Sequence, residues 1–400
     1  MSRAQDDARR SAVASPTDDV RLLFGDLHNH SLHSDGRGDP EQAFRLMRQA
    51  GLDVAALTDH ASIPLDRLPL LTLDDYPDDD ALAVARYAPR SIDQEAWKRT
   101  AEIADAHDEP GGFTALRGFE WTEPWLGHIN VWFSQDFTGV TTPGRLDGLH
   151  AFLEGAEPDA LFGYNHPGRE PGRFARFTPP PGRPGLARRM VALEAFNRTH
   201  DFLFEGLDRG QRSPIADCLD AGWRPGLIGC SDEHGRSYGL AGKGRTGLWA
   251  PEHSRAGVRA ALESRRTYAT REVGLRLDAT LDGVPMGSAL ARNGGGHAEL
   301  SVDLGGSSYQ GHAARLQVLA SSGTPALGPG QDGGVRVVAT ASARVGEVTT
   351  VRVPVPDGAR WLLLRVADPE RLPGGPHPAL HAGLGWALAY ASPWYLDGGA

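Results

Sequence analysis

Short apolar segments that each end in histidine or acidic residues recur through the first two thirds of the chain, and this pattern constrains the fold most. The first segment begins at Arg21 and leads into FGDLHNHSLHSDG at residues 24–36. His28 and His30 are one residue apart, so on an extended backbone their side chains project to the same side. Two imidazoles on one face at the end of a strand are natural metal ligands, and Asp35 is close enough in the chain to join them.

A helix and a second strand follow this histidine pair. Asp39 predicts an N-cap with Pro40 at the first helical position, and the apolar face of the helix stops at Gly51. Residues 52–57 form the next apolar segment, which leads to His60. The sequence therefore predicts a β-α-β unit whose two strands both deliver histidine at their carboxyl ends.

The same alternation continues to about residue 272. Strands that alternate with helices build a parallel sheet, and right-handed crossovers allow that sheet to close into a barrel. In such folds the active site lies at the carboxyl ends of the strands. The further strands are predicted at 113–119, 129–133, 160–164, 191–195 and 227–230, and the further helices at 94–107, 149–153, 215–221 and 255–264.

The pattern divides the chain into an α/β part and a β-rich part. Residues 1–19 are polar without periodicity and predict a flexible tail. Residues 61–92 form a long insertion in the α/β part (20–272), with scattered prolines and an acidic cluster. A long irregular insertion beside a candidate site favours a lid, and the alternative is a solvated loop without a role. In 273–400, alternating segments separated by glycine-rich turns predict a C-terminal β-sandwich-like domain.

Composition excludes several classes of protein. A net charge of −10 argues against a nucleic-acid partner. The only cysteines, Cys218 and Cys230, lie in apolar surroundings, so we expect buried thiols and no cysteine-based zinc site. No apolar run is long enough to cross a membrane, and we expect a cytoplasmic enzyme with a small-molecule substrate, its oligomeric state left open.

Histidines and carboxylates gather at one edge of the predicted sheet. Histidines with only a structural role would not be expected to gather at one edge, whereas the ligands of a shared metal site must lie together there. A glutamate among them can bridge two metals, because a carboxylate offers two oxygens, and the set suits Zn, Mn or Fe. The residues at or just after predicted strand ends are His28, His30, His60, Glu120, His166, Asp232 and His234; His128 begins a strand.

These motifs resemble the PHP (polymerase and histidinol phosphatase) superfamily: His-x-His before Ser-Asp-Gly, then Thr-Asp-His, a strand-end Glu, two further His and a closing Asp-x-His. The resemblance implies a distorted seven-stranded β/α barrel that binds two or three divalent metal ions. The ligands that it implies are His28, His30, Asp35, His60, Glu120, His128, His166, Asp232 and His234.

Further segments resemble the DUF3604 branch and related carbaryl-hydrolase-like enzymes. The resemblance implies hydrolysis of phosphoesters, or in some relatives of carbamates and other esters. The segments begin at Gly118 (GFEWT), Gly127 (GHINV), Thr246 (TGLWA), Arg266 (RTYAT), Pro285 (PMGS) and Trp386 (WALAYASPW).

A metal-dependent hydrolase is the function that the sequence favours. Adjacent divalent ions lower the pKa of a bridging water, so that hydroxide becomes available near neutral pH. We expect Glu120, Asp35 and His234 to act in catalysis, on a phosphoester. The alternatives are a carbamate, carboxylic ester or amide hydrolase with the same metal centre, and a non-catalytic PHP module, which the complete ligand set disfavours.

Arg169 and Arg236 each follow a ligand motif by two or three residues, so we expect them to bind an anionic substrate. Asp59, beside His60, is expected either to orient a ligand or to cap a turn. His33 lies between ligand positions and is not predicted to bind metal. The remaining histidines are expected on the surface or in loops: His107, His150, His253, His297, His312, His377 and His381.

Overall fold

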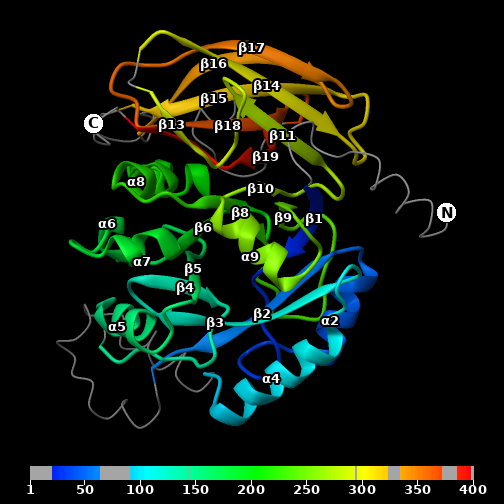
Figure 1. The fold of residues 1–400 in the computed structure, drawn as a ribbon, viewed down its shortest axis with the longest axis vertical. Coiled ribbons are helices and arrows are strands. Elements are labelled where there is room, and N and C mark those ends of the chain that lie inside the picture. The colour runs from blue at the N-terminus through cyan, green and yellow to red at the C-terminus, as the bar shows by residue number, and fades with distance from the viewer. Residues whose placement is uncertain are drawn as a thin grey trace.

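The computed structural model describes residues 20–63, 91–142, 144–292, 295–322, 334–371 and 385–397. A mixed α/β part occupies the lower half of Figure 1, and layers of strands from the C-terminal third occupy the upper half. The predicted N-terminal tail, most of the predicted lid, and His377 and His381 lie outside the described residues.

A large mixed sheet forms the centre of the lower part. Along this sheet β1, β2 and β3 are parallel neighbours, β4 is antiparallel to both β3 and β5, and β5, β6 and β8 are again parallel. Beyond β1, the strands β9 and β10 are added antiparallel. The bounds are β1 (Arg21–Asp26), β2 (Val54–Ala61), β3 (Thr114–Glu123), β4 (Gly127–Trp132), β5 (Leu161–Tyr164), β6 (Met190–Asn197), β7 (His200–Asp201), β8 (Gly226–Cys230), β9 (Arg245–Ala250) and β10 (Thr267–Thr270).

The carboxyl ends of β1 and β8 meet. Asn29 and Glu233 form a parallel bridge just beyond these strands. On either side of it, the His30 backbone N–H donates to the Glu233 carbonyl, and the Asp232 N–H donates to the His28 carbonyl, each at 3.0 Å. This pairing brings the first and last ligand motifs of the sequence side by side.

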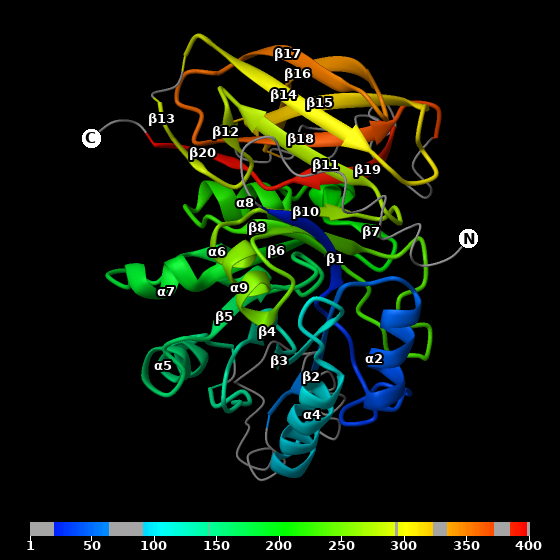
Figure 2. The same ribbon diagram turned by 45° about the vertical axis from the view of Figure 1, so that its right-hand side comes forward.

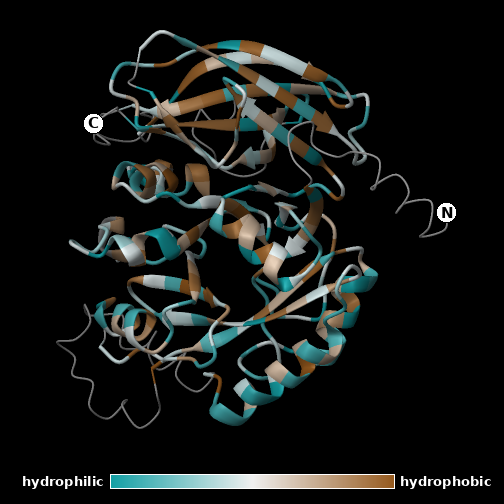
Figure 3. Cartoon of the chain, in the orientation of Figure 1, coloured by the Kyte–Doolittle hydropathy of each residue, from teal (hydrophilic) through white to brown (hydrophobic). Residues whose placement is uncertain are grey.

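The helices pack beside this sheet; five of them, α2, α4, α5, α8 and α9, agree with predicted helices, whereas α6 and α7 were not predicted. In α2 the Asp39 side chain accepts hydrogen bonds from the first turn, and Ala43, Phe44 and Met47 are buried, as their spacing predicts. Figure 3 shows hydrophilic and hydrophobic segments alternating along α2 and α4. The helices are α2 (Pro40–Gln49), α4 (Gln94–His107), α5 (Asp147–Gly155), α6 (Arg173–Phe177), α7 (Pro184–Arg189), α8 (Pro214–Asp220) and α9 (Arg255–Glu263).

The predicted α/β class is confirmed, but the uniformly parallel sheet is wrong at β4. Only three residues separate β3 from β4, too few for the helix that a parallel crossover needs. Gly127 closes this turn with a φ of 131°. A side chain there would meet the ring of Phe174, so only glycine fits. As a result His128 enters the site from an antiparallel strand.

The C-terminal strands form a four-stranded sheet and a group that continues the large sheet. The four-stranded order is β12-β11-β14-β17, and β19 pairs with β10, so the large sheet extends into the C-terminal segment (Figure 2). The bounds are β11 (Arg276–Leu281), β12 (Val284–Pro285), β13 (Ala289–Ala291), β14 (His297–Gly305), β15 (Ala313–Ser321), β16 (Val335–Arg344), β17 (Val348–Pro354), β18 (Trp361–Asp368), β19 (Trp386–Ala391) and β20 (Trp394–Asp397).

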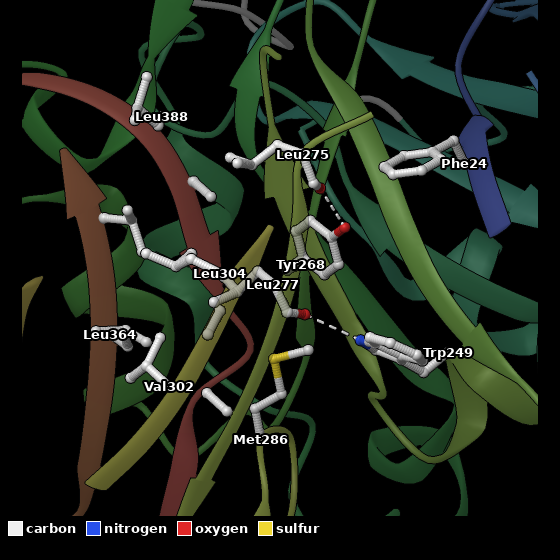
Figure 4. Packing of buried hydrophobic residues seen from close by; sticks show 14 of the residues in the cluster. Phe24, Trp249, Tyr268, Leu275, Leu277, Met286, Val302, Leu304, Leu364 and Leu388 are labelled. Atoms are coloured by element: carbon white, nitrogen blue, oxygen red, sulfur yellow. Dashed lines mark hydrogen bonds between the residues drawn. The ribbon is translucent and has the colours of Figure 1, made fainter. Parts of the chain in front are cut away.

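A shared hydrophobic core joins these strands to the α/β part. Leu277, Leu304 and Leu364 from the C-terminal strands belong to the same cluster as Trp249 and Tyr268 (Figure 4). The Trp249 Nε1–H donates to the Leu277 carbonyl at 3.0 Å. Burial of these large side chains accounts for the close attachment of the two parts, since each contributes roughly 1.5–3 kcal/mol when fully buried.

The predictions for the cysteines and for His150 and His253 have different outcomes. Both cysteines are buried free thiols, as predicted. The surface or loop position expected for His150 is wrong, because it is buried within α5. His253 lies in the loop between β9 and α9, as expected, but it is buried, and its Nε2 bonds to the Asp53 carbonyl at 2.9 Å. None of the described helices is long and apolar enough to cross a lipid bilayer.

Candidate metal centre

The structure brings together all nine residues that the sequence analysis named as ligands. They come from the carboxyl ends of β1, β2, β3, β5 and β8 and from the antiparallel β4. Within each of five overlapping groups, the potential ligand atoms lie within 4.8 Å of one another. These groups are His30, Asp35, His60 and His234; His28, His30 and Asp232; His28, Glu120 and His166; His60, Glu120 and His128; and His128, His166 and Glu170.

Glu120 lies at the middle of the cluster. It is fully buried, and the Asn165 side-chain amide donates to its Oε1 at 2.7 Å. Three imidazoles approach Oε1 and two approach Oε2, so the two oxygens face different groups of histidines. The nitrogen–oxygen distances lie between 2.7 and 3.4 Å for His28, His128 and His166 at Oε1 and for His60 and His30 at Oε2.

The donor distances fit metal ligation. Atoms bound at about 2.0–2.2 Å to one tetrahedral ion lie roughly 3.3–3.6 Å apart, and most of the distances around Glu120 are close to this. The Nε2 atoms of His28 and His30 face each other at 3.1 Å in the buried interior. The buried Nδ1 of His30 makes no hydrogen bond in the described part of the chain. A set of nitrogen and carboxylate donors without thiolates therefore fits a divalent metal site.

The electrostatics of the cluster favour bound positive charge. Burial opposes ionisation of Glu120, yet the neighbouring His28 and His128 hold its pKa well below the usual range. Burial also opposes protonation of His28, but Glu120 and Glu194 raise its pKa well above the usual value. At His30, burial and the nearby His234 hold the pKa well below the usual value, which favours the neutral imidazole that a metal ion requires.

Two ligand residues have strained backbones. His166 has a φ of 26° and Asp232 a φ of 48°, in the left-handed region that residues other than glycine rarely adopt. Such strain costs on the order of 1–3 kcal/mol and persists only when the surrounding structure holds it. Both residues lie two positions after a strand, His166 after β5 and Asp232 after β8, where the chain turns at the cluster.

Glu194 is a site residue that the sequence analysis missed. It is fully buried on β6, and its Oε1 lies 2.8 Å from the Nδ1 of His28. Its Oε2 accepts from the backbone N–H of His166 at 2.7 Å and from the side-chain amide of Asn197 at 2.9 Å. The sequence held a sign of this role, because Glu194 is the one charged residue in the apolar strand MVALEAFN.

Glu170 is a second missed carboxylate. Its Oε2 lies 3.5 Å from the Nδ1 of His166, whose Nε2 faces Glu120. His166 thus has one carboxylate at each ring nitrogen, as His28 does. Glu170 also forms a group of potential ligand atoms with His128 and His166, so it fits the site as a further carboxylate.

Asp59 and His33 contact the loop around the cluster. Asp59 accepts from the Ser31 N–H at 2.7 Å, the Ser31 hydroxyl at 2.8 Å and the Ser34 hydroxyl at 2.6 Å. Asp59 was expected either to orient a ligand or to cap a turn, and these bonds correspond to the second role. The Nδ1 of His33 bonds to the Thr100 hydroxyl at 2.7 Å, which directs its ring away from the cluster.

The two predicted substrate-binding arginines lie in different places. Arg169 reaches Asp232 at 3.4 Å and donates to the Asn197 side chain at 3.0 Å. Arg236 is exposed, and its Nε–H donates to the Arg37 carbonyl at 3.0 Å. Arg198, which the sequence analysis did not consider, approaches the same Oδ2 of Asp232 at 3.3 Å.

Comparisons with known proteins give a short family match and structural similarities. A family model described as a protein of unknown function (DUF3604) matches residues 72–137. A search of curated proteins gives no significant match.

Two solved structures illustrate the structural similarity. One is a two-domain protein from Bacteroides vulgatus that contains a predicted PHP-like metal-dependent phosphoesterase (TM-score 0.45, 19% identity, 94% of this chain and 96% of that chain covered). The other is an amidohydrolase from Chromobacterium violaceum with bound sulfate and no metal (TM-score 0.27, 15% identity, 62% of this chain and 97% of that chain covered). Neither description mentions carbamate hydrolysis, and the carbaryl-hydrolase-like branch stays a prediction.

Proposed function

We propose that this protein is a PHP-type metal-dependent hydrolase that cleaves a phosphoester in a small anionic substrate. The proposal includes the seven-stranded barrel with a C-terminal sandwich, and two or three divalent ions of Mn, Zn or Fe. One observation carries it: the buried Glu120 and the eight other predicted ligands gather in overlapping groups of potential ligand atoms at one end of the sheet.

The roles of the residues follow from their positions. Bound divalent ions supply positive charge and an activated water. Glu120 would bridge two ions, because its two oxygens face different histidines. Asp35 and the Nε2 of His234 are 3.2 Å apart, and their side chains are 11% and 26% exposed, more than the others of the set. This pair is therefore placed at the open side of the cluster, where the substrate would meet it.

The arginines support an anionic substrate. Arg169 and Arg198 both contact Oδ2 of Asp232, while 37% and 44% of their side chains remain exposed. Their open faces are suited to a phosphate or carboxylate group, which a guanidinium binds with paired N–H donors. A neutral carbamate would gain little from two such cations, so the geometry favours the phosphoester over the carbamate or ester alternative.

The proposal is tested with manganese-loaded protein, an anionic phosphoester and a neutral carboxylic ester. Arg169→Ala is expected to lower kcat/KM for the anion by roughly 10- to 100-fold, the value of a charge-assisted hydrogen bond. Arg236→Ala is the matched control, because the Nε–H of Arg236 donates to the Arg37 carbonyl, whereas Arg169 contacts the predicted ligand Asp232. Metal content is measured in both variants, since Arg169 also touches Asp232. Hydrolysis of neutral esters alone, or unchanged kinetics for Arg169→Ala, would contradict the proposal.

A further inference from the structure

The turn between β6 and β7 holds an unusual backbone conformation next to the metal centre. Phe196 pairs with Asp201 and Asn197 with His200, which leaves Arg198 and the following residue as a two-residue turn. Arg198 has a φ of 52°, a conformation that favours glycine or asparagine at this position. A bulky residue in such a conformation indicates a functional constraint held by its surroundings.

The side chain of Arg198 in this turn contacts two of the predicted metal ligands. The Nε–H of Arg198 donates to the Asp232 carbonyl at 3.2 Å, and its Nη2 lies 3.1 Å from the Nδ1 of His234. The backbone of Arg198 is held at both ends: its N–H donates to the Cys230 carbonyl at 3.0 Å, and its carbonyl accepts from the Gly244 N–H at 2.9 Å. A shift of the turn would therefore move the guanidinium relative to two metal ligands.

The buried Arg271 contacts two residues that follow Arg198, Thr199 and Asp201. Arg271 donates through Nη1 to the Thr199 carbonyl at 3.3 Å, and its Nη2 lies 3.3 Å from Oδ2 of Asp201. Its guanidinium carbon is 4.1 Å from the ring centres of both Phe196 and Trp386, so it lies close to an aromatic ring from β6 and one from β19. Stacking of this kind is strongest where the cation is desolvated, and Arg271 is buried.

Tyr390 extends the contact into the C-terminal strands. Its hydroxyl donates to the Asp201 carboxylate, whose oxygens lie at 2.9 and 3.0 Å. Arg365 from β18, which has no exposed surface, donates to the Tyr390 hydroxyl at 3.1 Å and to Gln317 at 2.6 Å. Buried charges are costly unless they are paired and hydrogen-bonded, and each partner here is placed by others in the network.

We propose that strand β19 is part of the active-site structure, with Tyr390 and Trp386 as positioning residues. They hold the β6–β7 turn through Asp201 and Arg271, and thereby set Arg198 over Asp232 for the anionic group of the substrate. This inference rests on the proposed function, and it gives the WALAYASPW segment a role in the site.

The test removes a single hydroxyl. Tyr390→Phe keeps the ring and loses the bond to Asp201. Tyr395→Phe is the matched control, because this buried hydroxyl donates to the Pro225 carbonyl before β8, away from the turn. Calorimetry measures the binding of inorganic phosphate to the manganese-loaded protein, and assays give kcat and KM separately. Tyr390→Phe is expected to weaken phosphate binding and raise KM about tenfold, the usual effect of losing such a support, with metal content unchanged.

A second variant separates positioning from general stability. Asparagine tolerates positive φ, so Arg198→Asn removes the guanidinium and keeps the turn. In that background Tyr390→Phe is expected to have no further effect on phosphate binding, because coupled residues are not additive. Equal effects of Tyr390→Phe and Tyr395→Phe, a full effect in the Arg198→Asn background, or no phosphate binding by the wild type would overturn the inference. If the protein binds phosphate but cleaves no phosphoester, the proposed function is wrong. The phosphate affinities of the variants then still test the positioning role of Tyr390.

Discussion

At the scale of single residues, the cluster depends on carboxylates that touch no substrate. Glu194 has no exposed surface, and a buried carboxylate is costly unless donors surround it. Three donors do so: the ring of His28, the backbone N–H of His166 and the amide of Asn197. With its Nδ1–H given to Glu194, His28 keeps the lone pair of Nε2 directed at the cluster, as a metal ligand requires.

Replacement of Glu194 by Gln is therefore expected to weaken metal binding. The glutamine NH2 group faces either His28 or the two donors of His166 and Asn197, so at least one of the three contacts is lost. We expect the affinity for Mn²⁺ to fall by roughly 10- to 100-fold, measured by calorimetry on the metal-free protein. Glu123→Gln is the control, because Glu123 is equally buried but accepts from the backbone of the β3–β4 turn. Equal affinities in the two variants would show that Glu194 has no role in ligation.

At the scale of elements, local patterns predicted most helices and ligand-bearing strands. The helix predicted at 94–107 agrees with α4, whose N-cap is Asp93 and whose buried face includes Trp97 and Ile103. Strands β9 and β10 went unrecognised, because they are antiparallel additions beyond β1 and do not follow the parallel strand–helix pattern that the prediction used. Arg198 and Glu194 were missed for another reason. Their partners lie on other strands, and no spacing in the chain reveals such contacts.

The loop after β1 gives a prediction at this scale. Asp59 accepts three hydrogen bonds from the loop that carries His30 and Asp35. Asp59→Asn replaces one acceptor oxygen by a donor, so we expect a looser loop and about tenfold weaker Mn²⁺ binding. Asp39→Asn is the matched control, because asparagine caps a helix about as well as aspartate does. A Kd for Asp59→Asn equal to that of the control would refute the role of the turn.

At the scale of the whole molecule, the C-terminal strands and the α/β part share one sheet. The ladder between β10 and β19 crosses the boundary predicted near residue 273, and Tyr268 and Trp249 bond to carbonyls of the C-terminal segment. That boundary stays a prediction, as does the closed barrel. The chain carries a net charge of −10, while its site gathers imidazoles and arginines. An acidic protein can therefore still present a cationic pocket, since bound metal ions are the largest local charges there.

The most direct test of the metal centre is anomalous X-ray diffraction from crystals of protein purified without chelator. The account predicts at least two transition-metal ions, about 3.5–4 Å apart, with one oxygen of Glu120 on each. No ligand is expected from His297 or His312, which are exposed on the C-terminal strands and the loop before β15. Anomalous density without an ion at Glu120, or with Glu120 bound to a single ion, would contradict the account.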